Sequence, residues 1–267
     1  MDKLDKAVIA MLRSVAERII LPRFRMLAAH EVSEKTPGEV VTIADRESEA
    51  WLTTQLSRLM PEARVVGEEA CESHPELLKG LDKGTVWLVD PLDGTRNFAA
   101  GLPHFAVMVA LVADGQTQGG WILDPVSARI CHARLGQGAW IDGVQVNARP
   151  TGQPGLVGAL PNRYADEAGR ARMERLRDEL GQALPGLMCA GADYPRCVDG
   201  TQDFAMFWRS LPWDHAPGAL FLEEAGGKIG WPDGTAYKVG STRPGLLAAC
   251  SPAIWDEAVA LAYHAGA

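Results

Sequence analysis

Two carboxylates stand three residues apart at the end of an apolar run, in Trp87-Leu88-Val89-Asp90-Pro91-Leu92-Asp93-Gly94-Thr95. The apolar half has the composition of a buried strand, and Pro91 favours a turn after it because its ring fixes φ. Asp90 and Asp93 can then face one point and hold a cation. Gly94 lets the backbone approach a ligand closely, and a helix that begins near Thr95 would offer free N–H groups to an anion. These residue types together indicate a metal-assisted phosphate site.

Two other segments carry acids beside apolar residues. Val65-Val66-Gly67-Glu68-Glu69 has the pattern of a short strand that ends in paired acids, and Pro212-Trp213-Asp214-His215-Ala216 precedes a segment of helical spacing. Carboxylates are the oxygen ligands that Mg²⁺ needs, with waters and substrate phosphate completing its shell. An isolated Asp-Pro or Asp-Gly pair is more typical of a turn. The prediction of a metal site therefore depends on all three segments.

In this order and at these separations, the segments resemble the motifs of the inositol monophosphatase family of Mg²⁺-dependent sugar and polyol phosphatases. Val41-Thr42-Ile43-Ala44-Asp45 matches a fourth motif, and the similarity extends from about Lys35 to the C-terminal helix. The resemblance implies an α/β fold of the sugar-phosphatase type, an α-β-α-β-α sandwich. It also implies a homodimer and inhibition by Li⁺.

The same resemblance implies two Mg²⁺ ions in the active site. Asp90 would bridge both ions, and Glu68 with the main-chain carbonyl of Leu92 would complete the first. Asp93 and Asp214 would hold the second ion. Two metals roughly 4 Å apart can neutralise phosphate charge, activate water and stabilise the leaving alkoxide.

Three residues would take part directly in the chemistry by resemblance to the family. Water oriented by Glu68 and Thr95 would attack phosphorus in line, and Asp45 would hold Thr95 through a hydrogen bond. The Gly94 and Thr95 amides would bind phosphate oxygens. Glu69 is expected to lie outside the ligand set, and a third, weaker Mg²⁺ through Asp45 and Glu68 is left open.

One departure from the family concerns substrate choice. Inositol-hydrolysing relatives carry a glutamate seven residues before the aspartate that corresponds to Asp214, where it binds a substrate hydroxyl; this chain has Phe207 there. Arg209 could meet an anionic or polar group instead, or be a structural or solvated residue. His215 is left out of the predicted site. The residues expected to contact substrate are Asp93, Gly94, Thr95, Ala190, Phe207 and Asp214.

Two classes of function are open. The first is a phosphomonoesterase that hydrolyses a small polyol or sugar phosphate such as inositol 1-phosphate, with histidinol phosphate, fructose 1,6-bisphosphate or a 3′-phosphoadenosine nucleotide as alternatives. The second is a regulatory protein of the same fold that binds a macromolecular partner. The intact set of acids favours the enzyme, because a binding protein would not need it.

Hydrophobic spacing indicates the helices that must position the first half of the site. Residues 4–26 show helical periodicity, and Pro22 is expected to end or kink that helix. Residues 42–60 form a second predicted helix. Thr42 is its candidate N-cap, and Asp45 three residues later completes a capping box, a role compatible with facing the active site.

Polar segments join these elements. Residues 31–39 are rich in turn formers and predict an exposed loop or hairpin, which in the family lies over the active site. For Lys35 in this segment, a solvated surface position is favoured over one beside the substrate. Residues 72–84 form a second polar link.

Short apolar runs separated by turn residues predict an antiparallel meander up to residue 143. The later runs are residues 104–112, 119–123, 129–133 and 139–141. Beyond a polar, Pro- and Gly-containing segment at 147–155, strands and helices alternate, which favours an α/β lobe. These elements are strands 156–160, 186–189 and 203–208, helices 165–182, 193–199 and 214–225, and a last strand and helix. We place a boundary near residue 150, between an N-terminal α+β lobe (1–150) and a C-terminal α/β lobe (151–267).

Composition limits the remaining possibilities. The 267 residues are 47% hydrophobic and carry a net charge of −8, which disfavours binding to nucleic acid or an anionic membrane because both require Lys and Arg. No run is long enough to cross a membrane, and the charged N-terminus lacks the pattern of a signal peptide. The five cysteines show no zinc or disulfide spacing. We therefore expect a cytoplasmic protein with reduced thiols.

Overall fold

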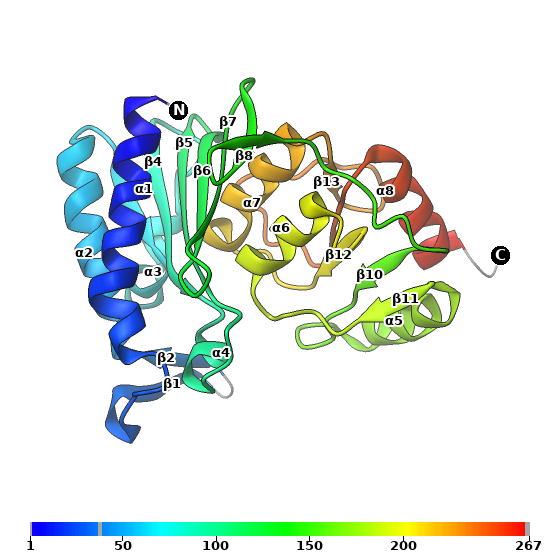
Figure 1. Cartoon of the computed structure of the whole chain (residues 1–267), viewed down its shortest axis with the longest axis horizontal. Coiled ribbons are helices and arrows are strands. Elements are labelled where there is room, and N and C mark those ends of the chain that lie inside the picture. Colours follow the sequence, from blue (N-terminus) through cyan, green and yellow to red (C-terminus); the bar gives the residue numbers. More distant parts are fainter. Residues whose placement is uncertain (1, 37–38, 265–267) are drawn as a thin grey trace.

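The computed structural model describes residues 2–36 and 39–264. It contains two large β-sheets, with helices between them and on both outer faces (Figure 1). The helices are α1 (Lys3–Val15), α2 (Ile43–Leu59), α3 (Glu68–Ser73), α4 (Thr95–Ala99), α5 (Glu167–Glu179), α6 (Ala190–Asp199), α7 (Pro212–Glu224) and α8 (Pro252–Val259). The layers run from α1 and α2 through the first sheet, α6 and α7, and the second sheet to α5 and α8. The expected α-β-α-β-α sandwich is confirmed.

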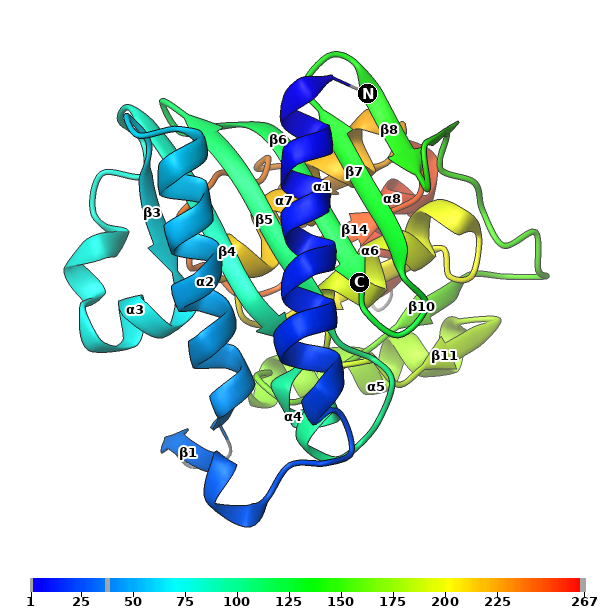
Figure 2. The same ribbon diagram turned by 60° about the vertical axis from the view of Figure 1, so that its left-hand side comes forward.

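Helices α1 and α2 cover the outer face of the first sheet (Figure 2). The side chain of Asp2 caps the start of α1 in a capping box. The helical path then continues as a π-helical turn over Ala16–Ile20 and a 3₁₀ turn over Leu21–Arg23, which contains Pro22. The regular α-helix is therefore shorter than the predicted 4–26, and the proline stands where the path ends.

The first sheet has seven strands in the order of the chain. They are β3 (Arg64–Gly67), β4 (Thr85–Asp93), β5 (Ala106–Ala113), β6 (Gln116–Asp124), β7 (Arg129–Arg134), β8 (Gly138–Ile141) and β9 (Val144–Val146). Strands β4 to β9 pair antiparallel, so the predicted meander is confirmed. Strand β3 is parallel to β4, which the sequence did not predict. Because parallel strands end at the same edge, Glu68 after β3 lies near Asp90 and Asp93 at the end of β4.

Helices α6 and α7 fill the space between the sheets. Helix α7 packs against β4, β5, β6 and β7, and most of its residues are buried. The packing is close, since a Cβ added to Gly120 of β6 would lie 2.6 Å from the carbonyl oxygen of Pro217. This contact holds α7 against the first sheet three residues after Asp214.

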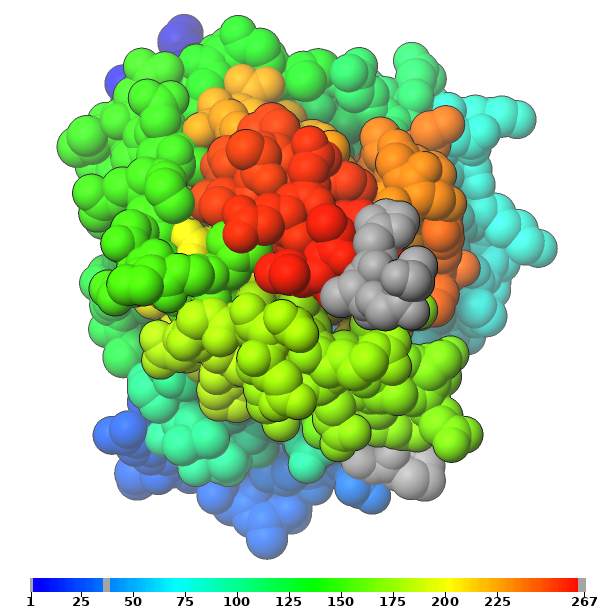
Figure 3. Space-filling model, turned by 90° about the vertical axis from the view of Figure 1, so that its right-hand side faces the viewer, coloured from blue at the N-terminus to red at the C-terminus, as the bar shows by residue number. Residues whose placement is uncertain are grey.

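The second sheet has the strand order β11-β10-β12-β14-β13. Its strands are β10 (Val157–Ala159), β11 (Gln182–Leu184), β12 (Phe204–Phe207), β13 (Lys228–Gly230) and β14 (Leu246–Ala249). Strand β10 pairs parallel with β11 and β12, whereas β14 pairs antiparallel with β12 and β13. Helices α5 and α8 lie next to each other on its outer face (Figure 3).

One strand prediction is wrong. Residues 186–189 form no strand, and the pairing with β10 is made by β11, four residues earlier. Met188 has a φ of +56°, a left-handed conformation that a strand cannot contain. The preceding helix also ends at Glu179 instead of residue 182, which leaves room for β11.

The connections complete the chain. Strands β1 (Val32–Thr36) and β2 (Glu39–Thr42) form an antiparallel hairpin before α2. The hairpin begins in the segment 31–39 predicted as a loop or hairpin and extends three residues beyond it. The strands of the first sheet lie within residues 64–146, and those of the second within residues 157–249. The boundary between an N-terminal lobe (1–150) and a C-terminal lobe (151–267) stays a prediction. No helix among the described residues is long and apolar enough to cross a membrane.

Candidate active site

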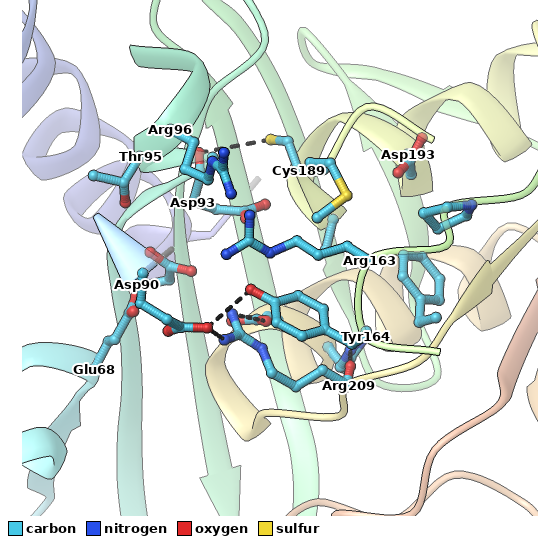
Figure 4. A pocket seen from close by; sticks show the side chains of 18 of the residues that line it. Glu68, Asp90, Asp93, Thr95, Arg96, Arg163, Tyr164, Cys189, Asp193 and Arg209 are labelled. Atoms are coloured by element: carbon cyan, nitrogen blue, oxygen red, sulfur yellow. Dashed lines mark hydrogen bonds and ion pairs between the residues drawn. The ribbon is translucent and has the colours of Figure 1, made fainter. Parts of the chain in front are cut away.

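A cavity of about 130 Å³ opens where the ends of β3 and β4 meet the first turns of α6 and α7 (Figure 4). Every residue predicted for the site, except Asp45, lines this cavity. These residues are Glu68, Asp90, Leu92, Asp93, Gly94, Thr95, Ala190, Phe207 and Asp214. Asp45 lies behind Thr95 and is connected to the cavity through it.

Asp90 and Asp93 both reach the cavity because β4 shifts its register against β5 between them. In a regular strand, residues three apart point to opposite faces. The N–H of Leu92 donates to Asp90 at 3.0 Å, and the N–H of Gly191 donates to Asp93 at 2.6 Å. Gly94 follows with a φ of +82°, and a Cβ there would lie 2.7 Å from a backbone oxygen. This turn therefore requires glycine.

Thr95 begins α4, and its hydroxyl is held by Asp45. Its Oγ1 lies 2.9 Å from Asp45 Oδ1 and 3.0 Å from the carbonyl oxygen of Leu92, so its single hydrogen is donated to one of them at a time. The other oxygen of Asp45 accepts from the N–H and hydroxyl of Thr42 at 2.8 and 2.6 Å. Burial raises the pKa of Asp45 to about 6. Both the predicted capping box and the predicted hydrogen bond to Thr95 are confirmed.

Glu68 is the first residue of α3, and the start of this helix is held by Glu49 of α2. The Glu49 carboxylate accepts from the N–H groups of Glu69 and Ala70, both at 2.7 Å. A Cβ on Gly67 would overlap that carboxylate, so glycine is required for this approach. Burial raises the pKa of Glu49 to about 7. Glu49 was not predicted from the sequence, although its place four residues after Asp45, on the same face of α2, was a usable signal.

The favoured surface position of Lys35 is wrong. Its side chain is only 9% exposed, and its Nζ lies 3.4 Å from Glu68 and 3.6 Å from Glu72, with a short contact to Glu69. Burial lowers the pKa of Lys35, but these three negative charges outweigh burial and raise it. The polar sequence of the hairpin predicted an exposed lysine. The three acids that pair with Lys35 belong to α3, so the hairpin sequence alone does not reveal them.

Asp214 joins the acids of β4 from the other half of the chain. Burial raises the pKa of Asp214 well above its usual range, and the charge of Asp93 adds to this, whereas Arg209 and a hydrogen bond with Asp90 lower it. Burial likewise raises the pKa of Asp90, helped by Glu68, Asp93 and Asp214. These acidic groups therefore lie close enough to repel one another.

A divalent cation fits this donor set. No three His, Cys, Asp or Glu side chains within residues 2–36 and 39–264 are already arranged around one metal position. The acids nevertheless line one cavity, their oxygens are hard ligands, and their mutual repulsion would be relieved by positive charge. Glu68, Asp90, Asp93 and Asp214 are thus chemically suited to hold Mg²⁺.

His215 has a structural role. Its Nδ1 lies 2.8 Å from the hydroxyl of Tyr194, and its Nε2 lies 2.9 Å from the carbonyl oxygen of Arg209. Burial lowers the pKa of His215 to about 4, so the ring is neutral at pH 7. With both nitrogens occupied, His215 supports the Arg209 main chain, although it also borders the cavity.

Comparisons with known proteins agree with this arrangement. A sequence profile of the inositol monophosphatase family matches residues 1–264. The chain is 34% identical over 202 residues to an inositol-1-monophosphatase of Rhizobium meliloti, covering 74% of each protein. It is 32% identical over 229 residues to the Nus factor SuhB of Pseudomonas aeruginosa, covering 81% of each. The structure is similar to an IMPase of Thermotoga maritima, with a TM-score of 0.81 and 26% identity, covering 99% of this chain and 98% of the other. The chain belongs to the inositol monophosphatase family.

Proposed function

We propose that this chain is a Mg²⁺-dependent phosphomonoesterase that hydrolyses a small polyol or sugar phosphate. The observation that carries the proposal is the convergence of four acidic side chains in one cavity, beside a threonine hydroxyl held by a buried aspartate. Phosphoryl transfer requires positioning and charge neutralisation more than covalent chemistry from the protein. Family membership and this arrangement support the same reaction class.

The acids would hold the metal and the nearby main chain would hold the phosphate. Bound Mg²⁺ would supply positive charge for the phosphate and for the leaving oxygen. Asp90 would lie between two ions, Glu68 and the Leu92 carbonyl would complete one position, and Asp93 with Asp214 the other. Whether a third Mg²⁺ binds through Asp45 and Glu68 is left open.

The attacking water would be oriented by protein groups. When the Thr95 hydroxyl donates to Asp45, its lone pairs can accept a hydrogen bond from water. Glu68 would accept the other hydrogen of that water, and the Gly94 and Thr95 N–H groups would meet phosphate oxygens.

A regulatory function is the second candidate, because SuhB of Pseudomonas aeruginosa is named a Nus factor. The complete acidic set favours catalysis over this alternative. We also propose a cytoplasmic homodimer that binds neither nucleic acid nor membranes, which light scattering and binding assays can check.

A panel of phosphomonoesters tests the proposed activity. Inositol 1-phosphate, histidinol phosphate, fructose 1,6-bisphosphate and 3′-phosphoadenosine phosphate would be incubated with the purified chain, with Mg²⁺ and with EDTA. We expect phosphate release from at least one substrate that depends on Mg²⁺. Absence of release across the panel, from a folded protein that binds a transcription or ribosomal partner, would support the regulatory alternative.

A further inference from the structure

The part of the cavity wall formed by the segments after β10 and β12 carries arginines. Arg209 comes from the segment between β12 and α7, and Arg163 from the segment after β10. Figure 4 shows the guanidinium of Arg163 extending towards Asp93, while Arg209 lies against the Tyr164 ring. Guanidinium groups bind carboxylate and phosphate with paired N–H donors. This wall therefore has the chemistry of an anion-binding site.

Arg209 is held in place by Tyr164, and its ion-pair partner Glu39 could be replaced by another anion. Its guanidinium carbon lies 4.3 Å from the centre of the Tyr164 ring, and its Nη2 lies 4.0 Å from Asp214. Its Nη1 pairs with Glu39 of the hairpin, which also accepts from the Tyr164 hydroxyl at 2.9 Å. The Arg209 and Glu39 side chains are 33% and 28% exposed. Because both side chains keep part of their surface exposed, an incoming anion can reach Arg209 and compete with Glu39 for it.

At Phe207 the cavity wall is an aromatic ring. The Phe207 ring packs between Tyr194 and His215, with centroid distances of 5.2 and 4.9 Å. It can contact a carbon skeleton but cannot accept a hydrogen bond. Recognition on this side of the cavity therefore depends on charge and ring contact.

We propose that Arg209, together with Arg163, binds a second anionic group of the substrate, a carboxylate or a second phosphate, in exchange for Glu39. This proposal rests on the phosphomonoesterase function proposed above. Because Arg209 lies 4.0 Å from Asp214, the second anion is expected close to the phosphate that is hydrolysed. Two other roles are the alternatives: Arg209 could bind the phosphate that is cleaved, or only neutralise Asp214.

Two pairs of matched substrates separate these roles. Glycerol 3-phosphate and 3-phosphoglycerate differ by a carboxylate, whereas fructose 6-phosphate and fructose 1,6-bisphosphate differ by a phosphate. We expect kcat/KM to be about tenfold or more higher for the anionic member of at least one pair, chiefly through KM. The pair that shows the preference identifies the second anion.

Variants on both sides of the ion pair give opposite results. Arg209→Gln is expected to bring the preference close to one, and Arg209→Lys to retain part of it. Glu39→Gln is expected to lower KM for the anionic member only, because its competing charge is gone. Arg175→Gln, an exposed arginine on α5, is the matched control and should leave the preference unchanged.

The outcomes that overturn the proposal are distinct from a failure of the enzyme assignment. An equal loss for both members in Arg209→Gln would assign Arg209 to the cleaved phosphate or to Asp214, and a wild type without preference would exclude the subsite. If none of these compounds is hydrolysed, calorimetry would measure the affinity of wild type and Arg209→Gln for the members of each pair. There, equal binding of both members overturns the subsite, while absence of Mg²⁺-dependent hydrolysis overturns only the proposed activity.

Discussion

At the residue scale, the Thr95 hydroxyl can orient a water only while another group fixes its hydrogen. Asp45 is that group, since its Oδ1 lies 2.9 Å from Thr95 Oγ1 and its other oxygen is bound by Thr42. The aspartate of the capping box therefore also orients the hydroxyl that we propose to bind the attacking water. The sequence predicted both partners of Asp45. Thr42 lies only three residues away in a capping box, and Thr95 belongs to a known family motif.

Thr95→Val tests this role with a side chain of the same shape. We expect kcat to fall by about a hundredfold or more with KM little changed, since the water loses an acceptor. Thr95→Ser keeps the hydroxyl and should retain most of the activity. Steady-state kinetics on the best substrate would measure both, and a valine variant within about threefold of wild type would contradict the assignment.

His132 of β7 predicts a pH dependence of stability at a distance from the active site. The ring is buried, stacks on Trp140 at 5.1 Å, and within the described ranges nothing hydrogen-bonds its Nδ1. Burial lowers the pKa of His132. The unfolded chain therefore takes up a proton near pH 6.5 that the folded chain does not, so acidification favours unfolding.

The comparison uses His132→Phe, which removes the titration and keeps an aromatic ring. Urea unfolding of both proteins at pH 7 and pH 5 would give the free energies of unfolding. We expect the variant to gain stability relative to wild type at pH 5. The same difference at both pH values would show that burial does not perturb this histidine.

At the element scale, the short helix α3 is held by α2. Glu49 accepts from two N–H groups in the first turn of α3 and so fixes Glu68 at the cavity. The sequence predicted α2 and its cap because these are local patterns. It missed Glu49 and misplaced Lys35 because their partners lie 20 or more residues away, in contacts that no local pattern records. It misplaced β11 because the short apolar run at 186–189 resembled a strand more than residues 182–184 did.

Glu49→Ala should loosen α3 and with it Glu68. We expect a loss of about 1–3 kcal/mol in the free energy of unfolding, because two partly buried N–H groups lose their acceptor. The Mg²⁺ concentration for half-maximal activity should also rise. The matched control is Glu47→Ala, an exposed glutamate on the same helix whose ion pair with Arg23 contributes little. Unchanged Mg²⁺ dependence in Glu49→Ala would limit its role to stability.

At the scale of the whole molecule, the cavity is formed by both halves of the chain. Strands β3 and β4 provide one wall, and α6, α7 and the segments before them provide the other. The hairpin connects the two walls, since Lys35 contacts α3 while Glu39 binds Tyr164 and Arg209. Ions and product phosphate are therefore expected to leave more slowly than from an open site.

We predict inhibition by Li⁺ from these hairpin contacts and from the family resemblance. We expect Li⁺ at millimolar concentrations to inhibit, because a small cation held by Asp93 and Asp214 would retain phosphate after hydrolysis. Titration of Li⁺ against Na⁺ at fixed substrate and Mg²⁺ would measure it. Equal, negligible effects of the two ions would count against a lithium-sensitive position.

The most direct test of the central claim replaces one proposed metal ligand from each half of the chain. Asp93→Asn and Asp214→Asn would be assayed for Mg²⁺-dependent phosphate release beside Asp178→Asn, an exposed aspartate on α5. Circular dichroism would verify that all three remain folded. We predict that both cavity variants lose Mg²⁺-dependent activity while the control keeps it, because each loses a charged oxygen ligand. Near-normal turnover in either cavity variant would contradict the assignment of these acids to Mg²⁺.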